Sequence, residues 1–252
     1  MKIGIVSAMN EEIDKLINES KSLTKNPYGG RLYYEGPLWD IDSVLVFSRW
    51  GKVAAATTIT HLIDNYNIDK IIFTGVAGGI DKKINIGDIV IAKELIQHDM
   101  DARPLFERYE IPLLGIRALK TDSYLNDKLL KASKKFLEED IKSCIQEELL
   151  KEFNLSNPKI IEAQIVSGDK FFSNKDEIKE LKSRFPQAVC VEMEGAAVAQ
   201  VCYEHKMPFS VIRTISDSAD EKAQIDFMKF LKNIASTYSF EILKNTYSIL
   251  NS

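Results

Sequence analysis

Short apolar runs alternate along this chain with segments of helical spacing, and several of the runs are hydrophobic on both faces. Residues 71–74 (Ile-Ile-Phe-Thr) are one such run. A strand that is buried on both faces belongs to a sheet that helices cover on both sides. The pattern therefore predicts an α/β fold, a three-layer α/β/α domain with a mostly parallel, mixed central sheet.

The same periodicities predict where the elements lie. Strand-like runs occur at 2–7, 31–36, 41–48, 71–74, 88–96, 159–167, 188–191 and 208–215, with Gly36-Pro37 as a turn signal after the second run. Helical spacing occurs at 10–20, 51–65, 125–153, 174–184, 194–205 and 225–250. The chain has 252 residues and no linker-like segment, so we expect one domain, 1–252, with an extended helical excursion near 136–158.

Charge and hydropathy argue against several function classes. The formal net charge is −4, and no Lys/Arg cluster is dense enough to resemble a nucleic-acid footprint. No apolar run approaches membrane-spanning length, and the N-terminal run is too short for a secretory signal. We therefore expect a cytoplasmic protein that binds neither nucleic acid nor a membrane.

Cysteine and histidine are poorly placed for a metal site. Neither type shows the spacing of zinc ligands, and two of the cysteines lie within apolar patterns typical of reduced, buried thiols. We expect no metal ion. The residues concerned are Cys144, Cys190, Cys202, His61, His98 and His205.

Carboxylates cluster where predicted strands end. Glu192 and Glu194 follow one strand, Asp217 follows another, and Glu11-Glu12 follow the first. Ligands of open α/β sheets bind at the carboxyl ends of the strands, so these acids indicate acid/base chemistry. Each also has a structural explanation: helix-dipole stabilisation for Glu11-Glu12, and capping or a turn for the others.

Other motifs are less decisive. The glycine-rich segment 75–79 indicates a loop with accessible backbone, or only a tight turn, and it lacks both nucleotide-binding glycine patterns. No Gly-x-Ser-x-Gly elbow supports a serine hydrolase. Phe171-Phe172, just beyond the strand near 160–166, could stack on a flat ligand or belong to the core.

Taken together, these motifs resemble the bacterial 5′-methylthioadenosine/S-adenosylhomocysteine nucleosidases of the purine nucleoside phosphorylase-like superfamily, over nearly the whole chain. The resemblance implies a nucleoside phosphorylase-like fold, and hydrolysis of the N-glycosidic bond of methylthioadenosine, adenosylhomocysteine and 5′-deoxyadenosine, with no cofactor, in methionine salvage. The segments that carry it are 3–12 (IGIVSAMNEE), 51–56 (GKVAAA), 74–79 (TGVAGG), 87–90 (GDIV), 166–169 (VSGD), 191–194 (VEME) and 213–220 (RTISDSAD).

The resemblance implies a role for each acid. Asp217 is the general acid at adenine N7, Glu12 activates the attacking water, and Glu194 binds the ribose hydroxyls. Arg213 positions Glu12 and the water. The chemistry agrees: protonation makes adenine a neutral leaving group, and a carboxyl can supply that proton where burial raises its pKa. One protonated carboxyl can also serve N7 and the N6 amino group together, which favours adenine over 6-oxopurines.

The resemblance also implies the lining of the substrate pocket. Met193 packs on the ribose, Phe171 stacks on adenine, the Phe172 backbone reads the base edge, and Phe227 lines the sugar and 5′ end. The remaining binding residues are Ala8, Met9, Trp50, Val76 and Gly78. Two of these depart from the family pattern, which often has Ser at Val76 and a Gly-Ile pair at Arg49-Trp50. Both departures bear on rate and on preference for the 5′-substituent.

Partners and rival functions follow from the same resemblance. It implies a homodimer in which Ala102, Leu105 and Pro112 line the 5′ pocket of the neighbouring subunit. A phosphorylase is disfavoured because a carboxylate at Glu12 would repel phosphate by roughly 4 kcal/mol at about 4 Å and a dielectric of ~20. A nucleoside-binding protein without activity is the other alternative, and a pure binder has no need for a water-activating acid.

Overall fold

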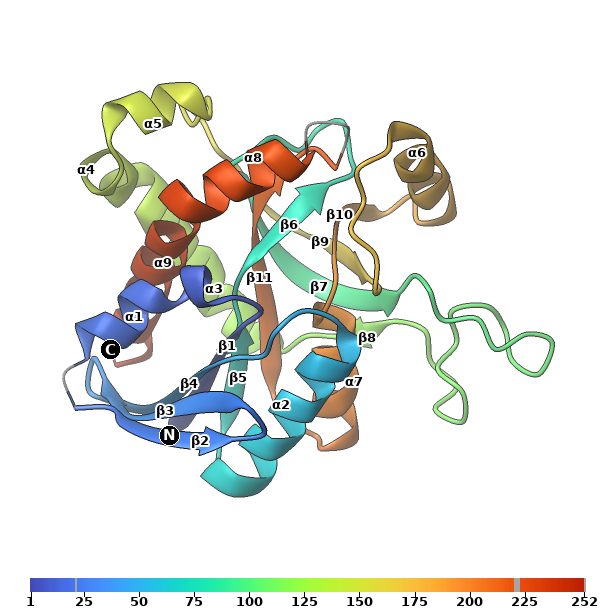
Figure 1. The fold of residues 1–252 in the computed structure, drawn as a ribbon, viewed down its shortest axis with the longest axis horizontal. Helices are drawn as coiled ribbons and strands as arrows, with labels where there is room; N and C mark the ends of the chain where they lie inside the picture. The colour runs from blue at the N-terminus through green and yellow to red at the C-terminus, as the bar shows by residue number, and fades with distance from the viewer. Residues whose placement is uncertain (21, 220–222, 252) are drawn as a thin grey trace.

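The computed structural model describes residues 1–20, 22–219 and 223–251. Within these residues one sheet runs through the molecule in the order β2-β3-β4-β1-β5-β11-β6-β10-β9-β7-β8, and β11 also pairs with β7 (Figure 1). The strands are β1 (Lys2–Ser7), β2 (Thr24–Tyr28), β3 (Arg31–Leu38), β4 (Ile41–Phe47), β5 (Lys70–Phe73), β6 (Val76–Gly79), β7 (Ile89–Gln97), β8 (Leu119–Lys120), β9 (Ile160–Ser167), β10 (Ala188–Glu192) and β11 (Phe209–Asp217).

Helices pack against both faces of this sheet. Along β1, Ile3 and Ile5 join one buried cluster with α3 and α9, whereas Val6 joins another with α2 and α7. Alternate residues of a strand point to opposite faces, so the two clusters lie on opposite sides of the sheet. The helical segments are η1 (Asn10–Glu12), α1 (Asp14–Glu19), α2 (Lys52–Tyr66), α3 (Ser123–Lys135), η2 (Phe136–Asp140), α4 (Ile141–Cys144), α5 (Glu147–Glu152), α6 (Lys175–Arg184), α7 (Gly195–Glu204), α8 (Ala223–Phe230), η3 (Leu231–Ala235) and α9 (Ser236–Leu250).

The sheet is mixed, and β11 connects its two halves. The start of β11 pairs in parallel with β5, and its second half pairs in parallel with β6 and antiparallel with β7. Every residue of β11 is buried. Strands β1, β4, β5 and the first half of β11 run in parallel, whereas β2, β3, β6 and β8 each make an antiparallel pair.

Three sequence-based expectations were wrong in detail. Residues 76–79 are a strand, β6, which pairs with β10 and β11 rather than forming a loop, because their backbone groups complete the ladder. Gly36-Pro37 lies inside β3, and the hairpin instead turns at Trp39 and Asp40, whose φ angles of 46° and 66° suit a tight turn. The single helix at 125–153 is interrupted at Ile145, which is extended (φ −121°, ψ 133°).

Residues 136–158, where the sequence predicted an extended helical excursion, contain η2, α4 and α5, which follow α3 (Figure 1). A second projection, residues 98–118 between β7 and β8, extends away from the body of the molecule (Figure 1). Over the described ranges, no helix combines the length and the hydropathy needed to cross a bilayer.

Candidate active site

A cavity of about 610 Å³, part of it open to solvent, lies where β1, β6, β10 and β11 end. Every residue expected to bind substrate within one subunit lines it. The cavity also includes residues that were not singled out for it: Ala77, Lys170, Val191, Ser216 and Ala219, together with Glu192, which the motif analysis had considered as a carboxylate. All except Lys170 lie within the motifs that carry the family resemblance, and Lys170 precedes Phe171.

Glu12 enters the cavity from the short turn η1 after β1. Its Oε2 accepts hydrogen bonds from the backbone N–H groups of Ala8 and Met9, each at 3.0 Å, and its Oε1 accepts one from Val76 at 3.0 Å. Burial raises the pKa of Glu12 to about 7, against the lowering effects of Arg213 and these hydrogen bonds. A carboxyl with a pKa near 7 is suited to act as a general base at neutral pH.

Gly75 lets the side chains of Glu12 and Arg213 both lie close against its backbone. A Cβ atom at this position would lie 2.7 Å from Oε1 of Glu12 and 3.2 Å from Nη1 of Arg213. Both distances are too short or tight for a side chain. A glycine is therefore favoured here because both charged groups occupy the space that a Cβ atom would need.

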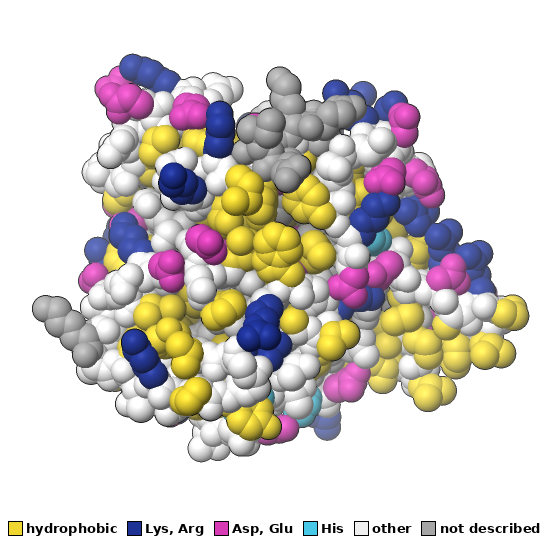
Figure 2. Space-filling model, viewed as in Figure 1, with side chains coloured by type: hydrophobic (Ala, Val, Ile, Leu, Met, Phe, Trp, Pro, Cys, Tyr) yellow, Lys and Arg dark blue, Asp and Glu magenta, His cyan; other side chains and the backbone are white. Residues whose placement is uncertain are grey.

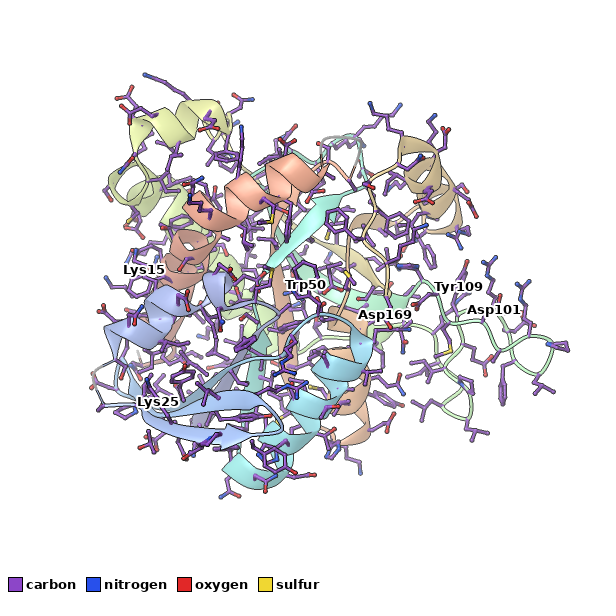
Figure 3. All side chains as sticks on the ribbon, viewed as in Figure 1. Lys15, Lys25, Trp50, Asp101, Tyr109 and Asp169 are labelled. Atoms are coloured by element: carbon purple, nitrogen blue, oxygen red, sulfur yellow. The ribbon has the colours of Figure 1, made fainter. Side chains whose placement is uncertain are left out.

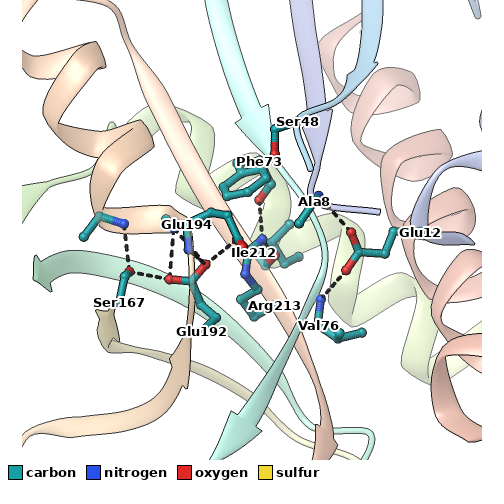
Figure 4. A network of polar contacts seen from close by, with 12 residues as sticks. Ala8, Glu12, Ser48, Phe73, Val76, Ser167, Glu192, Glu194, Ile212 and Arg213 are labelled. Atoms are coloured by element: carbon teal, nitrogen blue, oxygen red, sulfur yellow. Dashed lines mark hydrogen bonds and ion pairs between the residues drawn. The ribbon is translucent and has the colours of Figure 1, made fainter. Parts of the chain in front are cut away.

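Arg213 is fully buried in the middle of β11 and pairs with Glu192 (Figure 4). Its Nη2 donates to Oε2 of Glu192 at 2.7 Å, and Nη1 donates to the carbonyls of Phe73 and Ile212. The guanidinium carbon lies 4.1 Å from the centre of the Phe73 ring. Its Nε is buried and has no hydrogen-bond partner within the described part of the chain.

Glu194 lies at the N-terminus of α7, beside the segment that leads into α2. Its Oε1 accepts a 2.7 Å hydrogen bond from the N–H of Gly51. Burial, followed by the nearby charge of Glu192, raises the pKa of Glu194 to about 8. The carboxyl is thus oriented by Gly51, just before α2, and faces the same cavity as Glu12.

Asp217 is the last residue of β11 and is 2 % exposed. The register of β11 against β6 shifts between Ile215 and Asp217, and such a bulge redirects the side chains that follow it. Oδ2 of Asp217 accepts a hydrogen bond from Ser216 Oγ at 2.7 Å, and Oδ1 accepts one from the N–H of Ala219 at 2.8 Å. The carboxyl is thereby held in one orientation. Asp220, the last residue of its motif, lies outside the described residues.

Aromatic side chains form the mouth of the cavity. The Phe227 ring meets Trp50 and Phe171 edge to face, with ring centres 6.2 Å and 5.7 Å apart. Trp50 is 52 % exposed and Phe171 41 % exposed. Trp50 lies on the loop between β4 and α2 (Figure 3). Hydrophobic side chains gather in the middle of this face of the molecule (Figure 2). The mouth can therefore hold an apolar, flat or extended ligand group.

Ala102, Leu105 and Pro112 do not line this cavity; they lie on the projecting segment 98–118. Leu105 and, on the same segment, Leu113 are 83 % and 90 % exposed. Across the described residues, no group of three or more His, Cys, Asp and Glu side chains is arranged to hold a metal ion. The cavity itself offers carboxyl groups, one guanidinium and aromatic rings.

Comparison with known proteins identifies relatives that match nearly the whole chain. The model of the phosphorylase superfamily matches residues 2–246. The 5′-methylthioadenosine/S-adenosylhomocysteine nucleosidase of Haemophilus influenzae is 36 % identical over 245 residues, 97 % of this chain and 98 % of the relative.

Solved structures give the same result. The corresponding nucleosidase of Colwellia psychrerythraea, in complex with adenine, superposes with a TM-score of 0.84 at 32 % identity, covering 98 % of this chain and 95 % of the other. The futalosine hydrolase of Helicobacter pylori superposes with a TM-score of 0.83 at 32 % identity, covering 99 % and 98 %. The fold is therefore mixed α/β of the phosphorylase type, and the chain belongs to the phosphorylase superfamily and, within it, to the 5′-methylthioadenosine/S-adenosylhomocysteine nucleosidase family.

Proposed function

We propose that this protein hydrolyses the N-glycosidic bond of 5′-methylthioadenosine and S-adenosylhomocysteine, releasing adenine and the 5′-thioribose product. The observation that carries the proposal is the convergence of Glu12, Glu194 and Asp217 on one cavity with an aromatic mouth. The nucleosidases named above and the adenine in one of their structures support the same substrate class.

In the proposed mechanism Asp217 serves the adenine. Cleavage leaves negative charge on the departing base, and a proton donated by the Asp217 carboxyl to N7 turns adenine into a neutral leaving group. The buried position of Asp217 and its fixed orientation support this role. Phe171 stacks on the base, and the backbone at Phe172 reads its edge.

Glu12 serves the water in this scheme. Its carboxylate accepts a proton from the attacking water and stabilises positive charge on the sugar, while Arg213 orients the carboxylate and the water. The pKa of about 7 supports this role, because a large fraction of Glu12 is then ionised at neutral pH. Arg213 carries the positive charge that favours the ionised form.

Glu194 holds the ribose. Its carboxyl oxygens accept hydrogen bonds from the 2′- and 3′-hydroxyls, and Met193 packs on the sugar ring beside it. Phe227, Trp50, Ala8 and Met9 then surround the 5′ end, while Val76 and Gly78 line the pocket near the catalytic acid. The position of each of these residues at the cavity supports the assignment.

We extend the proposal to the wider substrate range, the setting and the assembly of the protein. 5′-Deoxyadenosine is a further substrate, no cofactor takes part, and the reaction serves methionine salvage in the cytoplasm. The chain forms a single three-layer domain, 1–252, and works as a homodimer in which Ala102, Leu105 and Pro112 complete the neighbour's 5′ pocket. The exposed apolar side chains of the projecting segment support the dimer.

Adenine release tests the proposal directly. Pure protein is incubated with 5′-methylthioadenosine with and without phosphate, and adenine is quantified by chromatography. We expect equal release in both buffers. Release only with phosphate would identify a phosphorylase, and no release in either would exclude the hydrolase. Futalosine, the nucleoside in the name of a solved neighbour, is the competing substrate, and faster cleavage of it would change the assigned substrate.

A further inference from the structure

Glu192 is the most extensively bound carboxylate at the cavity, although the proposed mechanism gives it no task (Figure 4). Its Oε1 accepts from the hydroxyl of Ser167 and, at 3.0 Å, from the N–H of Gly195. Its Oε2 accepts from the N–H of Glu194 at 3.2 Å, from the N–H of Gly195 at 2.8 Å and from Arg213 at 2.7 Å. One side chain thus connects β9, β10, β11 and the start of α7.

This carboxylate is far more than a helix cap. It binds the same guanidinium that faces Glu12 across Gly75, and it fixes the backbone that carries Glu194. The side chains of Arg213 and Glu192 are 1 % and 3 % exposed, so solvent screens their charges little. Removing one partner of such a buried pair leaves an uncompensated charge inside the protein.

We propose that Glu192 is a positioning residue for glycosidic-bond hydrolysis: it holds the Arg213 guanidinium and the Glu194 backbone in place, and its negative charge offsets that of Arg213 beside Glu12. The inference rests on the proposed function and extends it. Glu192 is not one of the three proposed acids, yet its charge influences the groups that hold the attacking water.

The charges around the site explain why this balance matters. Glu12 faces Arg213 of β11 and Glu194 at the start of α7. The charges of Glu192, Arg213 and Glu12 all influence the pKa of Glu194. The other charged groups that line the cavity in the described part of the chain are Asp217 and Lys170. Cys190, near Glu192, stays a neutral thiol because burial raises its pKa. Arg213 lowers the pKa of both Glu12 and Glu194, whereas Glu192 raises that of Glu194. We therefore expect that neutralising Glu192 lowers the pKa of Glu194, on which its charge acts directly, and also that of Glu12, because the charge of Arg213 is then no longer offset.

The test is the pH profile of kcat/KM for 5′-methylthioadenosine. The wild type is expected to lose activity below about pH 7, where Glu12 becomes protonated. In Glu192→Gln this acidic limb moves to lower pH by about one unit, the size of shift that an opposite charge within a few ångströms produces. Near pH 8, kcat/KM also falls about 10- to 100-fold, because Arg213 and the Glu194 backbone are no longer held.

Two matched variants separate charge from shape. Glu192→Asp keeps the charge but shortens the side chain, so kcat/KM falls while the acidic limb stays at the wild-type pH. Ser167→Ala removes one hydrogen bond to Glu192 and leaves its charge, so the limb again stays in place. The proposal would be refuted if the acidic limb of Glu192→Gln stayed at the wild-type pH, or if Glu192→Asp shifted it as far as Glu192→Gln does. Glu192 would then have a structural role only.

A second measurement does not depend on turnover. The infrared band of protonated carboxyl groups is titrated in the wild type, in Glu192→Gln and in Glu12→Gln, the last identifying the contribution of Glu12. We expect the Glu12 signal to titrate at lower pH in Glu192→Gln. If the wild type releases no adenine but the Glu12 titration still shifts in Glu192→Gln, only the proposed function is contradicted. If the Glu12 titration is the same in both proteins, the role of Glu192 is contradicted.

Discussion

At the scale of single residues, burial separates the acids of the site from ordinary surface acids. Glu11 and Glu12 are neighbours in the sequence, but Glu11 is exposed, whereas Glu12 is 2 % exposed and receives three backbone hydrogen bonds. Local spacing could not distinguish the two, because the first turn of a helix favours any acid. The distinction depends on Val76, which lies 64 residues away along the chain.

Glu12→Gln should abolish adenine release while leaving the fold intact. The amide keeps the size of the side chain but cannot take a proton from water, so we expect kcat to fall by at least about 100-fold. Glu11→Gln is the matched control and should retain wild-type kinetics. Steady-state adenine release and thermal unfolding check both variants. Near-normal turnover in Glu12→Gln would assign the general base to another group.

The wild-type pH profile tests the same residue in another way. The pKa of Glu12 is raised to about 7, and the base must be ionised to act. kcat/KM should therefore decrease as the pH falls below about 7, about tenfold per unit. Stopped assays between pH 5 and 9 measure this limb. A profile that stays flat down to pH 5 would contradict a base with a raised pKa.

Asp217→Asn should also abolish turnover, for a different reason. The amide oxygen can still accept the Ala219 hydrogen bond, but the amide is far too weak an acid to protonate N7. We expect a loss of about 10²- to 10⁴-fold in kcat, with 5′-methylthioadenosine still bound. Single-turnover kinetics and equilibrium binding of the substrate separate the two effects. Retained kcat would exclude Asp217 as the general acid.

At the scale of elements, the sequence predicted most strands and helices but missed the pieces that shape the site. Residues 76–79 contain two glycines and are short, so local composition favoured a loop. They form β6 because β10 and β11 supply hydrogen-bond partners from distant parts of the chain. The bulge in β11 that redirects Asp217 likewise depends on pairing with β6, and no local pattern predicts it.

The loop between β4 and α2 offers a test at this scale. Gly51 binds Glu194, whereas Trp50 packs edge to face on Phe227 at the mouth. Trp50→Ala should raise KM for 5′-methylthioadenosine roughly fivefold, about 1 kcal/mol, because an aromatic wall of the 5′ pocket is lost, while kcat changes little. KM for 5′-deoxyadenosine, with its smaller 5′ group, should rise less.

Val53→Ala is the control for that variant, since Val53 is the second residue of α2 and is 79 % exposed. It should leave both KM values unchanged. An equal rise of KM for the two nucleosides in Trp50→Ala would mean that Trp50 contacts the shared adenosine part rather than the 5′ group.

At the scale of the whole molecule, strand order brings the site together. Glu12, the 192–194 segment and Asp217 lie at or just after the ends of strands β1, β10 and β11, which the sheet brings near one another although they span most of the chain. The sequence identified those strand ends as a site, but not the order of the strands. Long-range pairings such as β11 with β7 are specified by packing of the entire core rather than by any single segment.

The projecting segment 98–118 carries the remaining prediction at this scale. Leu105 and Leu113 of this segment are 83 % and 90 % exposed. Exposed apolar side chains on one projecting segment are typical of a surface that contacts another protein. If this segment completes the partner's 5′ pocket, Leu105→Asp should shift the protein from dimer to monomer and raise KM for 5′-methylthioadenosine. Leu32→Asp makes the same change on β3, near the other end of the sheet, and should do neither. Sedimentation velocity at several protein concentrations measures the mass. A wild type that sediments as a monomer at every concentration would refute the dimer, and a monomeric Leu105→Asp with unchanged KM would show that the segment joins the subunits without contacting substrate.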